Sequence, residues 1–344
     1  MPLTIVDAMD NAGVWRAFAP DGVTPSTELS LTVDTSNRRP GVDAGTGRIA
    51  GTIHALNHSL RRNFAGLNLT NFDELRLWLY SDRPADGTPE RPFFLEMRLA
   101  SAAVALNDPS NTWQRYLPVS QIKTWEAVRL SIGDLTAAIR SAVTVIQLRC
   151  ASASVAFNCN IDTISAVRDA MIGDVDAALR AQLDGILTLN ETPVPAVLHP
   201  ANGTLTQKRP YIEITHYDIV YARERTQATR PRGDFTDRGY SIRPVSNAYE
   251  LYYEITAVAD DRQSQSQMLE SILRALPPRG EIFVNGDPLP MDMVIVLPLN
   301  QLGGSRTDRI PLFYRISRRQ QVGLSDLVVA AKTISVDGDV RAPR

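Results

Sequence analysis

The first half of the chain alternates apolar and polar residues with a period of two. In residues 72–81, Leu75, Leu77 and Leu79 occupy every second position, and residues 93–101 repeat the alternation after a turn-rich, proline-rich stretch. A half-buried strand requires this period, and we expect these two strands to pair. Four further strands are predicted over the ranges 112–119, 124–132, 143–150 and 155–164, with one short helix inside 132–142. Short strands separated by regular turn signals predict a two-sheet sandwich spanning roughly residues 10 to 165.

The period then changes. From Arg168 to Leu187 the apolar residues recur every three to four positions, at Met171, Val175, Leu179 and Leu183. This spacing predicts an amphipathic helix that packs its apolar stripe against a sheet. The boundary between domains is therefore expected just before this helix, which divides the chain into a β-sandwich over residues 1–165 and a second domain over residues 166–344.

The second domain alternates helices and strands. Residues 190–210 are rich in proline and predict an extended connection, and strands are predicted at 211–222 and 248–259. The pair Asp260 and Asp261 is a candidate N-cap for a second helix, which Pro277 and Pro278 would end. Three more strands are expected at 280–286, 293–299 and 310–317. This order predicts an α+β fold with one antiparallel sheet and helices packed on it.

Length and charge exclude several classes of protein. A chain of 344 residues is about twice the common domain size of roughly 150. The 36 Lys and Arg residues balance 38 Asp and Glu residues, for a net charge of −2, so sequence-specific nucleic-acid binding is not expected. Charged residues interrupt every apolar stretch before the length of about 18 that a membrane span needs, so no membrane insertion is expected. The N-terminal residues lack the features of a signal peptide, which predicts synthesis and residence in the cytoplasm.

The residues that carry most enzyme chemistry are scarce. His54 and His58 stand four apart, but no glutamate joins them and their context is typical of a loop. Cys150 and Cys159 are interpreted as buried free thiols on neighbouring strands rather than as a metal pair. No phosphate-binding, dinucleotide-binding or nucleophile-elbow motif occurs. We therefore predict no catalytic residue, no cofactor and no metal site, and expect that the protein is not an enzyme.

One charged segment is a candidate interface. Between residues 223 and 243 the arginines outnumber the acidic residues, in a predicted connection of 17 residues between two strands. A solvated loop is one interpretation. The other is a loop at a subunit interface, since the planar guanidinium forms bidentate pairs with carboxylates of a neighbour and long loops are often functional. The candidate interface residues are Arg223, Arg225, Arg230, Arg232, Arg238 and Arg243.

The first half resembles the jelly-roll, galactose-binding-like domains of carbohydrate-binding modules. The resemblance rests on a strand with Trp113, a second strand TWEAVRLSIGDL with Trp125, and a closing strand NIDTI with Asp162. It implies a jelly-roll sandwich. Tryptophans in strands usually pack in a core, whereas sugar binding uses aromatic rings on an open face. We expect Trp78, Trp113 and Trp125 to be core residues, and a single carboxylate at Asp162 is too little for calcium.

The second half, over about residues 168–337, resembles the cap or terminator proteins of extracellular contractile injection systems and, more distantly, phage tail terminators. The ordered set that carries the resemblance is MIGDVDAALRAQL, RPYIEITHYDIVYARER, YELYYEITAVADD, MLESILRALPPRG and IPLFYRISRR. Such proteins as a family begin at this helix, so the preceding sandwich departs from their pattern. The resemblance implies a ring-forming oligomer, a hexamer, with tube and sheath proteins of a contractile particle as partners.

Three functions follow as hypotheses. The first is a structural assembly protein that caps or terminates the inner tube, made in the cytoplasm and then incorporated into a phage tail-like particle. The second is a carbohydrate-binding module protein whose jelly-roll recognises a glycan. The third, a glycoside hydrolase, requires paired carboxylates in a cleft, and the sequence provides no motif for them.

Overall fold

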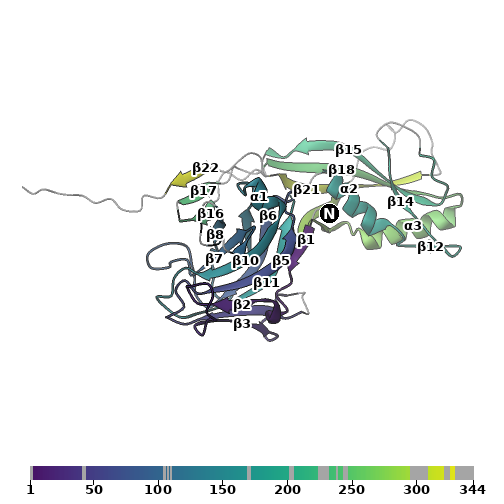
Figure 1. Ribbon diagram of the computed structural model, residues 1–344. Coiled ribbons are helices and arrows are strands. Elements are labelled where there is room, and N and C mark those ends of the chain that lie inside the picture. Colours follow the sequence, from purple (N-terminus) through teal and green to yellow (C-terminus); the bar gives the residue numbers. More distant parts are fainter. Residues whose placement is uncertain are drawn as a thin grey trace, which may run out of the picture. The chain divides into compact units, whose positions relative to one another are not determined.

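The computed structural model describes residues 3–40, 44–103, 106, 108, 111–168, 172–200, 205–223, 232–237, 239–242, 247–294, 309–320 and 326–329. Two compact units divide the chain. One, the sandwich unit, comprises Thr4–Ala166 with Arg230–Pro244 and Gly323–Arg344. The other, the α+β unit, comprises Met1–Leu3, Val167–Thr229 and Val245–Val322. The fold class is therefore multi-domain, with an all-β sandwich followed by an α+β unit (Figure 1).

The sandwich unit contains two antiparallel sheets over one core. The first sheet has the order β3-β4-β11-β6-β9, with β1 also paired to β11, and the second has the order β2-β5-β10-β7-β8. The strands are β1 Leu3–Asp7, β2 Arg16–Phe18, β3 Leu29–Asp34, β4 Thr46–Gly51, β5 Ser59–Leu67, β6 Glu74–Ser81, β7 Leu95–Ala100, β8 Trp113–Tyr116, β9 Glu126–Ser131, β10 Val143–Cys150 and β11 Phe157–Val167. A 3-10 helix, η1 (Ala12–Val14), and a short helix, α1 (Ala137–Ser141), complete these elements.

The expected pairing of the strands at 72–81 and 93–101 is wrong. Residues 74–81 form β6 in the first sheet, where they pair with β9, and residues 95–100 form β7 in the second sheet, where they pair with β10 and β8. β6 alternates between half-buried and buried residues as predicted, whereas β7 is buried on both faces, Glu96 included; both strands place leucines in the same core. The intervening residues therefore cross from one sheet to the other. A strand can bury its apolar face in either sheet. The alternation therefore predicts which face of each strand is buried, but not which strand it pairs with.

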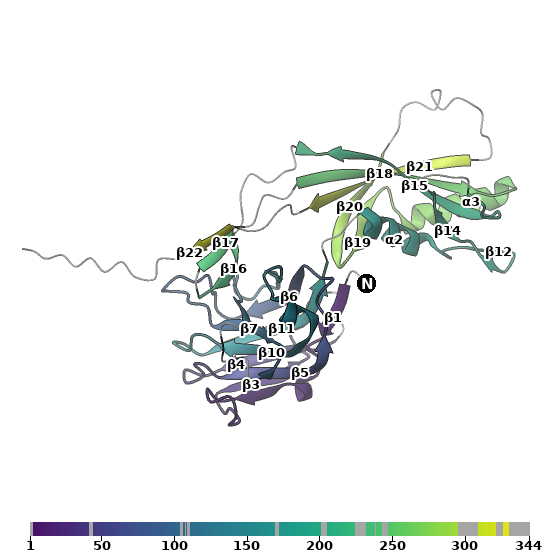
Figure 2. The same ribbon diagram turned by 45° about the horizontal axis from the view of Figure 1, so that its top comes forward.

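The α+β unit has a six-stranded sheet of order β14-β15-β18-β21-β20-β19. Its elements are α2 Ile172–Leu183, β12 Thr188–Leu189, β13 Thr192–Pro193, β14 Ala196–Leu198, β15 Tyr211–Tyr221, β18 Asn247–Val258, α3 Arg262–Ala275, β19 Arg279–Val284, β20 Asp287–Met293 and β21 Arg309–Gln320. β14 runs parallel to β15, and the pairs from β15 onward are antiparallel. Figure 2 shows the long strands β15, β18 and β21 side by side.

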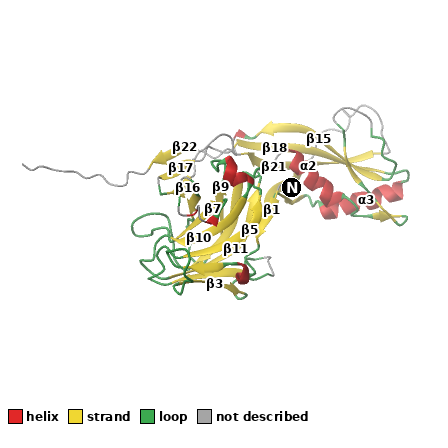
Figure 3. Ribbon diagram, viewed as in Figure 1, coloured by secondary structure: helices red, strands yellow, loops and turns green. Residues whose placement is uncertain are grey.

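Both predicted helices of this unit form and pack on the sheet. Val175, Leu179 and Leu183 of α2 are fully buried in one cluster with strand residues, which confirms the predicted stripe; Met171 lies outside the described residues. Asp261 caps α3 by accepting the N–H of Ser264 at 2.8 Å. Figure 3 shows the two helices against the strands of the sheet. The expected strand at 293–299 lies mostly outside the described residues.

The Arg-rich segment differs from the expected loop. Its middle forms two strands, β16 (Arg232–Thr236) and β17 (Gly239–Ile242), which pair antiparallel, and β17 pairs in turn with β22 (Asp326–Val329). These three strands belong to the sandwich unit, although their residues come from the second half of the sequence. Along the chain β15 leads to β16, β17 leads to β18, and β21 leads to β22. The order β16-β17-β22 therefore repeats the order β15-β18-β21 of the long strands.

Candidate functional site

An aromatic group lies on the outer face of the first sandwich sheet. On β6 the buried Leu77 and Leu79 alternate with the half-buried Trp78 and Tyr80. The ring of Tyr80 lies 5.5 Å from that of the half-buried Trp125. The expectation that the tryptophans are core residues is therefore wrong for Trp78 and Trp125: Trp78 occupies an outward position of β6, and Trp125, which directly precedes β9, is only half-buried.

Trp113, in contrast, is buried as expected. Its side chain is 5% exposed, and its Nε1–H donates to Asp134 at 3.0 Å. The guanidinium of Arg115 lies 4.8 Å from the centre of its ring. A buried indole usually finds such a partner for its N–H group, so Trp113 is explained by packing alone.

Polar side chains next to the aromatic group are fixed by one another. Arg39 stacks 4.7 Å above the ring of Trp78, and its Nε donates to the buried Asp162 at 2.6 Å. Asn160 donates to Asp34 at 3.0 Å, and hydrogen bonds from Ser36 and Asn160 hold the pKa of the Asp34 carboxyl far below its usual range. Asp162 is thus occupied by an arginine. This face presents rings and ordered polar groups, which is a surface suited to a polar ligand with apolar edges.

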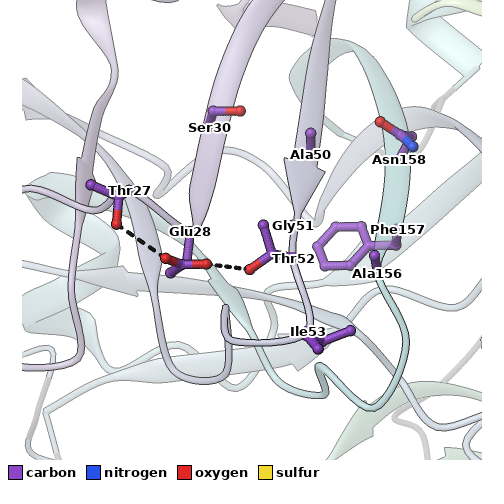
Figure 4. A pocket seen from close by; sticks show the side chains of 10 residues that line it. All are labelled: Thr27, Glu28, Ser30, Ala50, Gly51, Thr52, Ile53, Ala156, Phe157 and Asn158. Carbon is purple, nitrogen blue, oxygen red and sulfur yellow. Dashed lines mark hydrogen bonds between the residues drawn. The ribbon is translucent and has the colours of Figure 1, made fainter.

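An open pocket lies at another end of the same sheet (Figure 4). Glu28 lies between two hydroxyl groups and accepts hydrogen bonds from Thr27 at 3.2 Å and from Thr52 at 2.5 Å. These bonds lower the pKa of Glu28, with that from Thr52 contributing most. The ring of Phe157 forms one wall. The lining residues are Thr27, Glu28, Ser30, Ala50, Gly51, Thr52, Ile53, Ala156, Phe157 and Asn158. The pocket contains one carboxylate, whereas glycoside hydrolysis normally needs a pair.

The hairpin β16–β17 docks on the sandwich through Asp234 and Phe235. Asp234 is 4% exposed, accepts the backbone N–H of Ser131 at 2.7 Å, and lies 3.7 Å from Nε of Arg115. Phe235 packs its ring 5.1 Å from that of Phe93. β16 therefore contacts β8 and β9, which are the last strands of the two sheets. Sequence reasoning missed this contact; the two aromatic residues in the charged segment, Phe235 and Tyr240, were the available signal.

Two of the six candidate arginines lie in the part of the chain that the structure describes. Arg223 is exposed just beyond β15, and Arg232 begins β16. Arg225, Arg230, Arg238 and Arg243 lie outside the described residues. The segment is thus partly strand rather than loop, and its role at a subunit interface stays a prediction.

The cysteines and histidines do not assemble a reactive centre in the described part of the chain. Cys150 and Cys159 are free and buried, as predicted, on β10 and β11 of the two facing sheets. Burial raises the pKa of Cys150 to about 11, so its thiol stays protonated at neutral pH. Residues 52–58 form turns, and Nδ1 of His58 lies 2.7 Å from the Ser26 hydroxyl. Among the described residues no group of three or more His, Cys, Asp and Glu side chains is arranged to hold a metal ion.

The solved structures that resemble this chain include proteins of two kinds, tube terminators and carbohydrate-binding modules. No protein-family model matches the chain, and no curated protein matches it. A sheath/tube terminator of the PVC extracellular contractile injection system is 21% identical, over 51% of this chain and 66% of that one, with a TM-score of 0.38. The tube-terminating cap of the anti-feeding prophage is 20% identical, over 48% and 61%, with a TM-score of 0.36. Both resemblances predicted from the sequence are confirmed.

The carbohydrate-binding likeness is the more distant one. A family 11 carbohydrate-binding module from Clostridium thermocellum, solved with a mixed-linked tetrasaccharide, is 8% identical over 48% of this chain and 95% of that one, with a TM-score of 0.34. All three TM-scores lie below 0.5, so these likenesses by themselves assign no function. The matched part also spans about two thirds or less of each terminator chain. In the part of the chain that the structure describes, no helix has the length and apolar character to cross a membrane.

Proposed function

We propose that this chain is a structural assembly protein that ends the inner tube of a contractile injection system or phage tail, with or without the last sheath layer, as a ring-forming oligomer. The observation that carries the proposal is the ordered set α2, β15, β18, α3 and β21 in one helix-backed sheet. These are the elements in which the sequence resembles tube terminators. The partners are further copies of this chain, six in the ring that the resemblance implies, and the tube and sheath subunits of the particle.

The path of the chain supports a structural role for the sandwich. The polypeptide passes between the two units after Leu3, Ala166, Thr229, Pro244 and Val322. A module that only presents a binding face would need a single linker. Repeated passage makes the sandwich an integral part of the protein, and the proposal includes no enzymatic activity.

Location on the particle tests this function. We expect antibody labelling of particles purified from producing cells to place the chain at one end of the tube, and deletion of its gene to leave tubes of irregular length. Light scattering of the purified chain is expected to report a closed oligomer. A strict monomer that is absent from purified particles would contradict the proposal.

Glycan recognition is a second candidate, favoured by the outer-face position of Trp78, Tyr80 and Trp125. An aromatic face in water is suited to stack on the apolar face of a sugar ring. If the sandwich binds a glycan there, replacing Trp78 or Trp125 by Ala should weaken binding about fivefold or more, since each stacked ring contributes on the order of 1 kcal/mol or more.

A glycan array followed by calorimetric titration measures this effect. Leu273→Ala, which shortens a 37% exposed side chain on α3 of the α+β unit, is the control and should leave glycan binding unchanged. Absence of any glycan signal for the unmodified chain, or equal loss in the control, would remove this second candidate.

A further inference from the structure

One edge of the α+β sheet is open along β15. This strand runs from Tyr211 to Tyr221, but its outer neighbour β14 pairs only with Ile212–Ile214. From Thr215 to Val220 the described residues place no strand on that side. A strand with such an edge presents backbone N–H and C=O groups that can pair with another chain.

The open part of β15 carries exposed apolar side chains. Tyr217 and Ile219 are each 44% exposed, and Val220 is 41% exposed. Natural edge strands are usually blunted with lysine, proline or a bulge. Thr215–Val220 contains no lysine and no proline, but it has a register irregularity between His216 and Asp218, and the Asp218 carboxylate accepts the N–H of Ile219 at 2.8 Å. Beyond the irregularity the pairing with β18 continues, and the exposed side chains of Tyr217, Ile219 and Val220 remain for a covering strand to bury.

The opposite edge of the same sheet is open as well. β19 is the last strand in the order, and among the described residues β20 is its strand partner, on one side. Its Ile282 and Val284 are buried, whereas Phe283 is 68% exposed. Phe283 is the most exposed aromatic side chain among the large hydrophobic residues of the described chain. When another strand packs beside a sheet edge, it removes the apolar surface of an exposed phenylalanine from water, which favours the association.

The two edges match one another in length and direction. Thr215–Val220 and Arg279–Val284 each span about 20 Å of extended chain. Consecutive strands from β15 through β18, β21 and β20 to β19 are antiparallel at every step, so β15 and β19 run in the same sense. A rotation that carries one copy onto the next about an axis parallel to the strands leaves the strand direction unchanged. The β19 edge of one copy and the β15 edge of the next copy can therefore pair in parallel, a head-to-tail contact that closes a ring when the rotation between copies divides a full turn.

We infer that the partner of the β15 edge is the β19 edge of a second copy of this chain, and that this pairing joins the α+β sheets of neighbouring subunits. The inference rests on the ring proposed above and names the surfaces that form it. Backbone hydrogen bonds supply much of the contact, and Ile219 and Phe283 supply its apolar side chains. Because the two edges differ, the contact is heterologous rather than two-fold symmetric.

Charge placed on either edge tests the inference. Ile219→Lys and Phe283→Lys each put an ammonium group where a neighbouring strand would pack, so each variant is expected to run as a monomer of 37.9 kDa in size-exclusion chromatography with light scattering. Leu273→Lys, at a 37% exposed position on α3 of the same unit, is the matched control and should keep the oligomer of the unmodified chain. Circular dichroism and thermal melting of all three variants verify that they fold.

A mixture of the two edge variants provides the second readout. Each Ile219→Lys copy retains an intact β19 edge, and each Phe283→Lys copy retains an intact β15 edge. The mixture should therefore form a one-to-one dimer that cannot grow, although each variant alone is monomeric. Edge variants that fold and still form the oligomer of the unmodified chain, or a mixture that stays monomeric, would overturn the inference. An unmodified chain that forms no oligomer and is absent from particles would instead overturn the proposed function.

Discussion

Replacing Leu179 by Ala is expected to lower the free energy of unfolding of the α+β unit by about 2 to 5 kcal/mol. Leu179 is fully buried in the middle of the apolar stripe of α2, which packs on β14, β15 and β19. Truncation removes apolar contact and leaves a cavity that the surrounding helix and strands fill only in part. Urea unfolding of the purified chain, followed by circular dichroism, measures the loss.

The control for this change lies one residue further along the same helix. Arg180 is exposed, so Arg180→Ala should change the free energy of unfolding by less than about 0.5 kcal/mol. The two units can unfold in separate steps. The free energies of unfolding of both variants are therefore compared for the one transition that Leu179→Ala shifts to lower urea concentration. A loss below about 1 kcal/mol for Leu179→Ala would mean that this position does not carry the packing of α2 on the sheet.

The sequence predicted the elements whose own residues carry a strong period. β10 was expected at residues 143–150 and occupies those residues, and the helix expected from Arg168 to Leu187 forms as α2 from Ile172 to Leu183. Both elements have an apolar face long enough to be recognised without knowledge of their partners. Strands such as β2, with three residues, and β4, which contains two glycines, present no such pattern. They are strands because the neighbouring strands of their sheets pair with them.

The contacts of the candidate surfaces depended on partners distant in sequence. Trp78 lies in a strand, as Trp113 does, and Trp125 lies just before one. Their local sequences do not distinguish the buried Trp113 from the two half-buried rings, because the arrangement of the sheets decides which ring is covered. The open edges of β15 and β19 likewise follow from the order of strands in the sheet. Periodicity identifies the face that a residue occupies, but the position of its strand in the sheet decides whether that face or edge is covered.

The hairpin β16–β17 shows how such a contact links the two halves of the sequence. Its strand β16 lies against β8 and β9, which end the two sheets of the sandwich. Edge strands that are covered in this way are protected from pairing with other chains. The second half of the chain therefore completes the fold of the first, and a sandwich expressed from residues 1–165 would lack this cover.

Asp234→Ala is expected to be the most damaging change in this hairpin, with a loss of about 3 kcal/mol in the free energy of unfolding of the sandwich unit. The buried carboxylate accepts the N–H of Ser131 and faces Arg115, so its removal leaves a half-buried amide and a buried guanidinium with fewer partners. Asp234 also has a φ of 50°, a conformation that Ala adopts at a cost. Denaturant unfolding measures the loss, and the rate of trypsin cleavage between residues 223 and 243 reports release of the hairpin.

Two further variants separate the causes of this effect. Asp234→Asn keeps an acceptor for the Ser131 N–H and tolerates the positive φ, so it should lose less than Asp234→Ala, and the loss that remains is the part due to the charge facing Arg115. Asp237 lies exposed in the turn of the same hairpin, and Asp237→Ala should leave both stability and cleavage rate nearly unchanged. If Asp234→Ala unfolds at the same denaturant concentration as Asp237→Ala and is cleaved no faster, the docked hairpin does not stabilise the sandwich.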